Sequence, residues 1–195
     1  MNTEQIASLR GMLGNFSADA KNVAARSHVD QIASFMAGEA QPWSRATLEG
    51  HLTASAWVLD RTRSHAAMIH HRKLGRWLQP GGHIEDGDAS WRAAAQREVT
   101  EEVGLTAFIA LPDAEQLFDV DVHSIPARID VPAHFHYDLR VLFIADVDAG
   151  LGDQLKLNLD EASDCRWFRL TDLASEPALE LSLRRMVELS IRNFS

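Results

Sequence analysis

The feature that most constrains this 195-residue chain is a glycine turn that leads into a helix with clustered carboxylates. From residue 81 to residue 105 the sequence reads GGHIEDGDASWRAAAQREVTEEVGL. The alanine run has a high helix propensity and predicts a helix over Ala89–Val103. Asp86 or Asp88 can cap the start of this helix, and Gly104 suits the position just after its end. The segment therefore predicts a turn followed by one capped helix.

Three glutamates of this helix, Glu98, Glu101 and Glu102, are spaced at i, i+3 and i+4 and share one face. Like charges at this spacing destabilise an isolated helix by roughly 0.2–0.5 kcal/mol per pair, and a divalent cation would remove that repulsion. Mg²⁺ and Mn²⁺ take oxygen ligands and are commonly completed by substrate phosphates. The cluster therefore indicates a Mg²⁺ or Mn²⁺ site, and a solvated acidic face is the alternative. An apolar stripe beside it is expected to face the core: Trp91, Ala95, Val99 and Val103.

Runs with strand character lie on both sides of the helix, which predicts an α/β sandwich with a mixed sheet. They are LTASAWVLD and HAAMIHH before the helix, and LTAFIAL, EQLFDVDVH, HFHYDLRVLFIADV and CRWFRL after it. The stretch KLGRWLQPGG predicts a loop, and a terminal helix is expected after Pro177. Residues 1–40 predict two short amphipathic helices. We divide the chain into a helical N-terminal extension with a connector, residues 1–50, and a main domain, residues 51–195.

The net charge and the amino-acid composition limit the kinds of partner that the chain is expected to bind. The chain has 19 basic and 28 acidic residues and a net charge of −9, which disfavours long nucleic acids and anionic membranes as partners. The single cysteine, Cys165, excludes an internal disulfide and fits a reducing compartment. No apolar run approaches the length of a membrane span. We expect a cytoplasmic protein with a small-molecule substrate, no long nucleic-acid partner and no membrane association, and the N-terminal helices leave a homodimer open.

The turn and helix resemble the signature box of the Nudix hydrolases, Gly-x5-Glu-x7-Arg-Glu-apolar-x-Glu-Glu-x-Gly-apolar. The second half of the box matches in full, from Arg97 to Leu105. In the first half, Gly82 is followed after five residues by Asp88 instead of Glu, and eight residues instead of seven precede Arg97. The box is thus one residue longer than the family pattern, and a turn can absorb this residue without rotating the carboxylates. The resemblance covers about residues 51–195.

This resemblance implies a Nudix fold and a metal-dependent hydrolase that cleaves a diphosphate linkage in a small nucleotide-type substrate. By position in the box, the Gly82 carbonyl and the carboxylates of Glu98, Glu101 and Glu102 would hold the metal. Arg97 would orient Glu98 through a salt bridge, and Arg97 and the three glutamates are the catalytic candidates. Two alternatives stay open: a Nudix-like module that binds a nucleotide or another metabolite without turnover, and isoprenoid-diphosphate chemistry on the same scaffold.

Residues around the box add candidates for substrate contacts. His83 lies in the turn of the box, and Arg76 belongs to a basic run just before it, where a solvated hairpin tip is an equally good interpretation. Glu161, in the loop NLDEASD, is a candidate general base.

Two strand runs after the helix alternate polar and apolar residues. One contains His123, and the other contains His134, His136, Asp138 and Arg140. If these strands are adjacent, the three histidines and Asp138 could meet at a second metal or at polar groups of the substrate, and Arg140 could meet a phosphate. A polar sheet face with apolar residues buried beneath it is the alternative.

Overall fold

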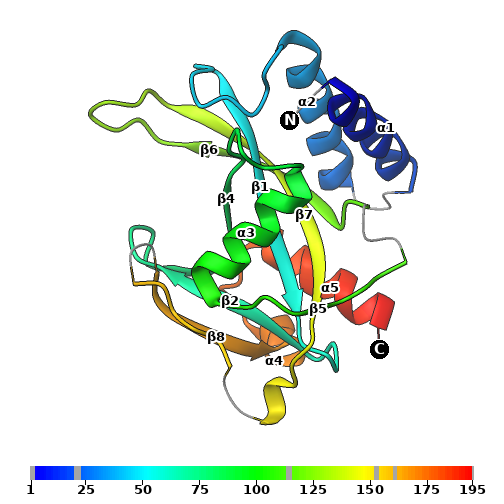
Figure 1. The fold of residues 1–195 in the computed structure, drawn as a ribbon, viewed down its shortest axis with the longest axis vertical. Coiled ribbons are helices and arrows are strands. Elements are labelled where there is room, and N and C mark those ends of the chain that lie inside the picture. The colour runs from blue at the N-terminus through cyan, green and yellow to red at the C-terminus, as the bar shows by residue number, and fades with distance from the viewer. Residues whose placement is uncertain (1–2, 20–22, 113–115, 152–153, 160–161, 195) are drawn as a thin grey trace. The chain divides into compact units, whose positions relative to one another are not determined.

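Figure 1 shows the fold from a computed structural model, which describes residues 3–19, 23–112, 116–151, 154–159 and 162–194. The helices are α1 (Thr3–Asp19), α2 (Val23–Gly38), α3 (Trp91–Val103), α4 (Leu170–Ser175) and α5 (Leu181–Phe194), with a 3-10 turn η1 at Ala149–Leu151. The strands are β1 (Gly50–Leu59), β2 (His65–His71), β3 (Arg76–Leu78), β4 (Gly81–His83), β5 (Phe108–Ile109), β6 (Asp119–Ile125), β7 (His134–Ala145) and β8 (Ala162–Arg169). The predicted α/β class with N-terminal helices is confirmed.

The chain divides into two compact units. Unit 1 consists of Met1–Ser55, Gly82–Ala95 and Glu115–Val141, and unit 2 consists of Ala56–Gly81, Gln96–Ala114 and Leu142–Ser195. The elements β1, β4, β7 and α3 each run from one unit into the other. The division of the chain at residue 50 stays a prediction.

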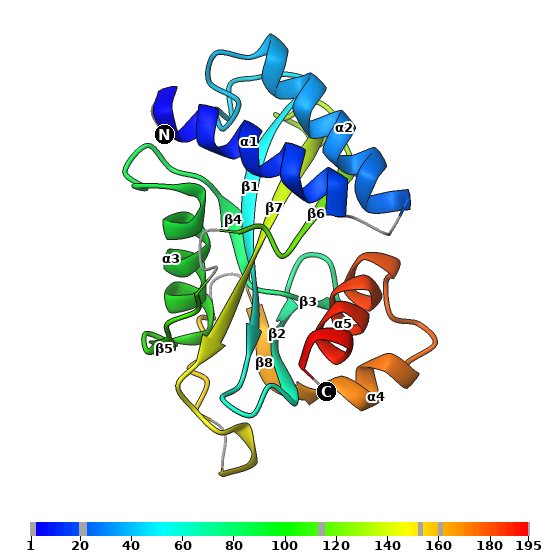
Figure 2. The ribbon, with the colours of Figure 1, turned by 90° about the vertical axis from the view of Figure 1, so that its right-hand side faces the viewer.

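Helices α1 and α2 of unit 1 bury their apolar residues on one face, as expected for the amphipathic helices predicted over residues 1–40. Leu9 and Leu13 of α1 and Ile32 and Met36 of α2 are almost fully buried. Helix α2 packs against β6, and the ring of Phe35 stacks on that of Tyr137 in β7 with centroids 4.2 Å apart. Figure 2 shows α1 and α2 side by side.

Strands β6 and β7 of unit 1 pair antiparallel from Asp119↔Arg140 to Ile125↔His134. Because side chains alternate between the two faces of a strand, Val120 and Leu139 point to an apolar face and both are fully buried. Strand β1 lies on the other side of β7, and their arrows run in the same direction in Figure 2, which makes the sheet mixed as predicted.

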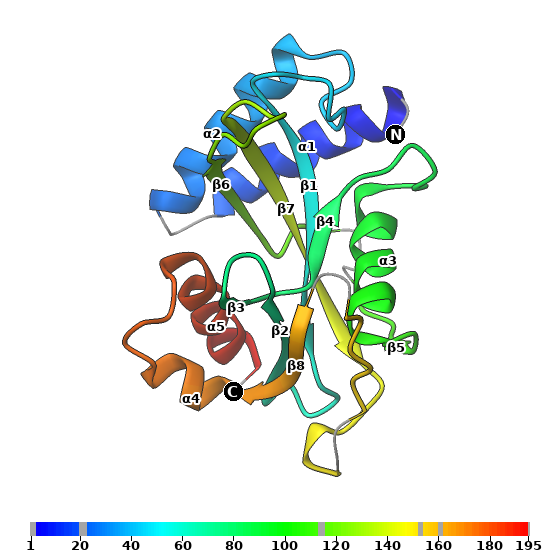
Figure 3. The same cartoon turned by 90° about the vertical axis from the view of Figure 1, so that its left-hand side faces the viewer.

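Unit 2 is built around β2, which pairs antiparallel with β8, with β3 and with the end of β1. The end of β7 pairs antiparallel with β5. Helix α4 follows β8 directly and packs against α5 (Figure 3). The indole Nε1–H of Trp57 in β1 donates to Ser190 Oγ of α5 at 2.8 Å, and both residues are fully buried.

Four local predictions need correction. Helix α3 is capped by Ser90 and not by an aspartate, because Ser90 Oγ accepts a hydrogen bond from the Ala93 amide at 3.1 Å. Asp88 instead accepts from the Glu85 amide within the preceding turn. The stretch KLGRWLQPGG contains β3 and the start of β4, since antiparallel pairing with β2 orders part of it. Helix α4 was not predicted, and of LTAFIAL only residues 108–109 form a strand.

Within the ranges that the structure describes, none of the helices combines the length and the apolar character needed to cross a bilayer.

Candidate functional site

Helix α3 places its apolar stripe in the core and its glutamates on another face. Ala95, Val99 and Val103 are fully buried. Glu98 and Glu102 are also largely buried, with 9% and 4% of their surface exposed, whereas the side chain of Glu101 is 52% exposed. The helix thus carries two enclosed carboxylates and one that faces solvent.

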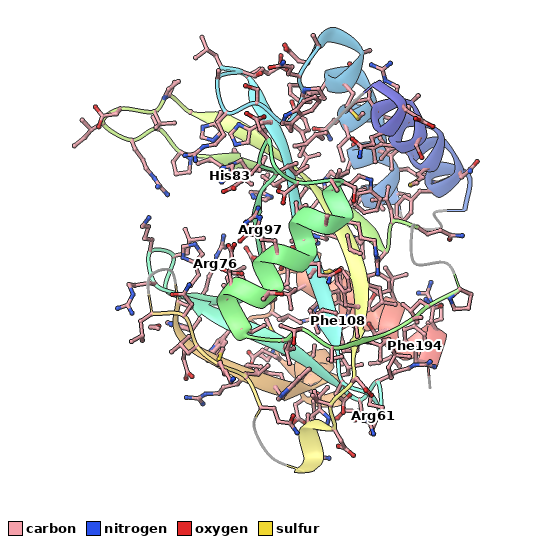
Figure 4. All side chains as sticks on the ribbon, viewed as in Figure 1. Arg61, Arg76, His83, Arg97, Phe108 and Phe194 are labelled. Carbon is pink, nitrogen blue, oxygen red and sulfur yellow. The ribbon has the colours of Figure 1, made fainter. Side chains whose placement is uncertain are left out.

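Arg97 bridges two of these carboxylates. Its Nη1 donates to Glu98 Oε1 at 2.9 Å and to Glu101 Oε2 at 3.1 Å (Arg97 is labelled in Figure 4). The salt bridge between Arg97 and Glu98 that the resemblance implies is therefore present. Because one guanidinium nitrogen serves both partners, Arg97 fixes the orientation of Glu98 and offsets part of the repulsion between the glutamates.

Glu102 is held by the glycine segment before the helix, which forms strand β4 and not the predicted turn. Its Oε2 accepts a hydrogen bond from the backbone amide of Gly81 at 2.9 Å. This contact links the start of β4 to the third carboxylate of α3.

The C-terminal end of α3 is tied to the segment that precedes β8. The amides of Lys156 and Asn158 donate to the carbonyls of Val103 and Glu102 at 2.8 and 3.2 Å. Gly104 has φ +71°, and a Cβ at this position would lie 2.7 Å from Lys156 Cβ. Gly104 is therefore the residue after the helix end, as predicted, and only glycine fits both its backbone conformation and its neighbour.

The donor chemistry of α3 suits a hard divalent cation. Glu98, Glu101 and Glu102 offer only carboxylate oxygens, which Mg²⁺ and Mn²⁺ prefer. In the described part of the chain, the one group of three or more histidine, cysteine or acidic side chains with ligand atoms within 4.8 Å of one another is elsewhere. Glu98 and Glu101 share Arg97 as a partner, and Glu102 accepts from the Gly81 amide.

A polar network fills one face of the strands in unit 1. Arg140 is 2% exposed, and its guanidinium lies 3.1 Å from Asp119, 3.1 Å from Asp138 and 3.4 Å from Asp121. Burial alone would lower the pKa of Arg140, but the charges of Asp138, Asp119 and Asp121 outweigh it and raise the pKa above its ordinary value. Three buried carboxylates surround this side chain, and the phosphate contact predicted for Arg140 stays a prediction.

Asp138 belongs to the same network and not to a histidine site. It is 3% exposed and accepts hydrogen bonds from Thr53 Oγ1 at 3.0 Å and from Ser55 Oγ at 2.7 Å. We predicted that Asp138 would meet the histidines. The structure instead bonds Asp138 to Thr53 and Ser55 of β1 and to Arg140 of β7.

Histidines converge at the neighbouring end of this polar face. The ring centroids of His51 and His83 lie 5.0 Å apart, those of His51 and His136 lie 4.9 Å apart, and those of His83 and His136 lie 5.3 Å apart. One ring nitrogen of each residue lies within 4.8 Å of the others. Three strands, β1, β4 and β7, supply the three rings.

Burial favours the neutral form of two of these histidines, His51 and His136. It lowers the pKa of His51 to about 4 and that of His136 to about 2, and the charges of neighbouring histidines such as His83 lower both further. His51 is 4% exposed, and neither of its ring nitrogens has a hydrogen-bond partner. A neutral imidazole is the form of histidine that binds metal ions.

The other sequence candidates lie at different distances from these three rings, and the ring of His134 is in contact with that of His51 at a centroid distance of 5.1 Å. His134 and His123 border the cluster, with centroids 5.3 and 5.5 Å from that of His136. His134 Nδ1 donates to the Pro132 carbonyl, and His123 Nδ1 lies 3.2 Å from Asp121. In unit 2, Arg76 forms a salt bridge with Glu180. Glu161 lies outside the described residues.

His51 is the member of the cluster that the sequence analysis did not single out. The run HLTASAW alternates as the histidine strands do, with His51, Thr53 and Ser55 on the polar face and Leu52 and Ala54 between them. The period-two test that found the histidine strands would have detected this polar face as well.

The fold and the site together describe an α/β protein in which a glycine segment is bonded to a helix that carries three carboxylates on one face. The family model described as NUDIX domain matches residues 50–189. The chain therefore belongs to the Nudix family.

Individual relatives agree with this family. The chain is 32% identical over 124 residues to an RNA pyrophosphohydrolase of Acidiphilium cryptum, an alignment that covers 62% of this chain and 72% of the relative. The predicted enzyme class, a Nudix-type pyrophosphohydrolase, is confirmed by the family match and this relative.

Two solved structures share the fold. A NUDIX-family hydrolase from Clostridium perfringens has a TM-score of 0.52 at 21% identity, covering 73% of this chain and 97% of that one. The NUDIX domain of NrtR from Shewanella oneidensis, crystallised with ADP ribose, has a TM-score of 0.50 at 19% identity, covering 84% of this chain and 98% of that one.

Proposed function

We propose that this protein is a divalent-metal-dependent hydrolase that cleaves the diphosphate linkage of a small nucleotide-type substrate. The observation that carries the proposal is the set of three glutamates on α3, of which Glu98 is oriented by Arg97 and Glu102 by the Gly81 amide. A module that only binds its ligand has no physical need for three carboxylates on one helix face, so this arrangement favours turnover over binding alone.

Glu98, Glu101 and Glu102, together with the carbonyl of Gly82, would hold Mg²⁺ or Mn²⁺. A bound cation of this kind neutralises phosphate charge and lowers the pKa of water. Arg97 keeps Glu98 in position and compensates its charge. The Gly81 amide restricts the rotation of Glu102. Preorganised carboxylates of this kind reduce the reorganisation needed when the substrate arrives.

The general base is proposed among the carboxylates. One of the three glutamates, or Glu161, would accept the proton of the attacking water. The contacts of His83, Arg76, His123, His134 and His136 with substrate stay predictions. Arg76 forms a salt bridge with Glu180, so a phosphate contact of Arg76 would either replace this salt bridge or form beside it.

The net charge of the protein bears on the size of its substrate. The net charge of −9 disfavours binding along an extended polyanion, which favours a small substrate. The named activity of the Acidiphilium cryptum relative adds one polymeric candidate, the 5′ end of an RNA, where the chain end alone would have to enter the site.

The experiment that tests this proposal measures product release from a panel of compounds with Mg²⁺, with Mn²⁺ and with EDTA. The panel contains nucleoside triphosphates, nucleotide sugars, dinucleoside polyphosphates, isoprenoid diphosphates and a 5′-triphosphorylated RNA oligonucleotide. We expect metal-dependent hydrolysis of one small-nucleotide group, abolished in Glu102→Gln. Thermal stabilisation by one compound without cleavage would contradict the proposal and favour a binding module.

A further inference from the structure

We propose that His51, His83 and His136 form a binding site for a divalent transition metal such as zinc. These residues lie in unit 1, so the inference rests on contacts inside one compact unit and is independent of the proposed function of the α3 carboxylates. The ligand set is nitrogen-only, whereas the set on α3 is oxygen-only.

The short distances between the ring nitrogens support the proposal. One ring nitrogen of each residue lies within 4.8 Å of the others. On a tetrahedral zinc ion with Zn–N bonds of about 2.0–2.1 Å, ligand nitrogens lie about 3.4 Å apart. Small rotations of the rings about their side-chain bonds are therefore enough to close the set around one ion.

The burial of His51 supports it independently. This residue is 4% exposed, and its Nδ1 and Nε2 are both buried without a hydrogen-bond partner. An unsatisfied buried polar atom costs about 1–3 kcal/mol, so such a side chain needs a compensating interaction. A metal bound to one nitrogen would supply it, and the lone pair of a neutral imidazole is the ligand that such a metal takes.

The surroundings of the cluster favour a cation over an anion. Asp121 lies 3.2 Å from Nδ1 of His123, whose ring borders that of His136. Behind it, the carboxylates of Asp119, Asp121 and Asp138 surround a single guanidinium, that of Arg140. The charge of Arg45 also acts on His51, but the three carboxylates outnumber the two guanidiniums, so excess negative charge remains near the histidines.

Three histidines leave one tetrahedral position for water or a ligand atom. The proposed site is thus of the open type, in which an exogenous oxygen can complete the coordination. Zinc and the neighbouring metals Co²⁺ and Ni²⁺ fit an imidazole set, while Mg²⁺ does not.

The test is a titration of the full-length protein, freed of metal by a chelator and dialysed, with Co²⁺ followed by Zn²⁺. Visible absorption reports the coordination of Co²⁺ by nitrogen ligands, and calorimetry gives the stoichiometry and the affinity for Zn²⁺. We expect one ion per chain in the wild type, the tetrahedral Co²⁺ spectrum, and displacement of Co²⁺ by Zn²⁺.

Single substitutions test which side chains bind the metal ion. His51→Ala and His83→Gln should weaken Zn²⁺ binding by more than the roughly 10- to 100-fold that the loss of an outer-shell partner costs. His83 lies on the short strand β4 and is only half-buried, so His83→Gln keeps the test valid if His51→Ala does not fold. His70→Ala is the matched control, because His70 already pairs with Ser163 in unit 2, and it should bind zinc as the wild type does.

Three results would overturn the proposal. The first is the absence of stoichiometric Zn²⁺ binding by the folded wild type. The second is unchanged Zn²⁺ affinity in folded His83→Gln, and a nucleotide affinity that falls in the same variant would then assign His83 to the substrate. The third is loss of Zn²⁺ binding in Glu102→Gln alone, which would place the ion on the carboxylates.

Discussion

Arginine holds carboxylates in both compact units, but the two arrangements differ in burial and in composition. In unit 2, Arg97 is 23% exposed and bridges Glu98 and Glu101, one enclosed and one facing solvent. In unit 1, Arg140 is 3% exposed at its side chain and lies among three buried aspartates. The first group includes one carboxylate that faces solvent, and the second is enclosed on all sides by the protein.

We propose that this difference separates carboxylates that serve chemistry, on α3, from carboxylates that serve structure, around Arg140. A buried charge that is paired and hydrogen-bonded on all sides cannot rearrange cheaply, because each lost partner leaves an uncompensated charge. A partly exposed pair can exchange its partner for a cation or for water at small cost. Opposite responses to substitution are therefore expected: activity changes in the α3 group and stability changes in the Arg140 group.

The largest effect is expected on turnover from Glu98→Gln. The substitution keeps the shape and the hydrogen bonding of the side chain but removes a charge proposed to hold the metal, so turnover should fall by about 1,000-fold or more. Circular dichroism and the melting temperature should stay close to those of the wild type. Glu188→Gln, at an exposed position of α5, is the matched control. Wild-type turnover in Glu98→Gln would end the assignment of α3 as the catalytic helix.

The largest effect on stability is expected from Arg140→Met. Removing the guanidinium leaves three buried carboxylates without their cation, and the free energy of unfolding should fall by about 3–5 kcal/mol. Urea denaturation followed by fluorescence measures the change. Arg61→Met is the control, since Arg61 and its partner Asp146 are about half exposed and their pair contributes at most about 1 kcal/mol. Equal effects of the two substitutions would contradict the contrast between buried and exposed pairs.

A smaller loss of stability is expected from Ser55→Ala. Its hydroxyl donates to Asp138 at 2.7 Å, and a hydrogen bond to a charged group contributes about 1.5–3 kcal/mol. The same urea experiment should show this decrease. Ser175→Ala, at an exposed position in α4, should leave stability nearly unchanged. A Ser55→Ala protein as stable as the wild type would show that Thr53 and Arg140 satisfy Asp138 without help.

The smallest effects are expected from Arg97→Met. Both the unfolding free energy and the turnover are measured for this variant. The unfolding free energy should fall by less than in Arg140→Met, because the Arg97 side chain is 23% exposed and Glu101 faces solvent. Turnover should fall about tenfold through the misplaced Glu98, with little change in KM. Arg97→Lys should recover part of this loss, as it restores the charge without the planar geometry. A stability loss as large as that of Arg140→Met would remove the distinction between the two regions.

The α3 group could be predicted from the sequence because its residues follow one local period. Glu98, Glu101 and Glu102 share a face in any straight helix, and the neighbouring Arg97 lies within reach of two of them. The cap at Ser90 was missed since several polar residues precede the helix, and only the path of the turn decides which of them meets the first amides.

The histidine cluster could be predicted only in part. The antiparallel pairing of β6 with β7 brings His123 opposite His136, as the two alternating runs suggested. His51 and His83 come from strands far away along the chain, and the register between such strands is set by packing that a single sequence does not display. The same limit applies to Arg140, whose burial depends on three aspartates from two strands.

The tie between the end of α3 and the segment before β8 has a consequence for slow motions of the backbone. Lys156 and Asn158 belong to no helix or strand, yet their amides are bonded to carbonyls of the last turn of α3. In deuterium oxide, these two amides should exchange with the slow rate of a helix end rather than with that of a loop. Fraying of the carboxylate helix from its C-terminus must then release this connecting segment in the same event.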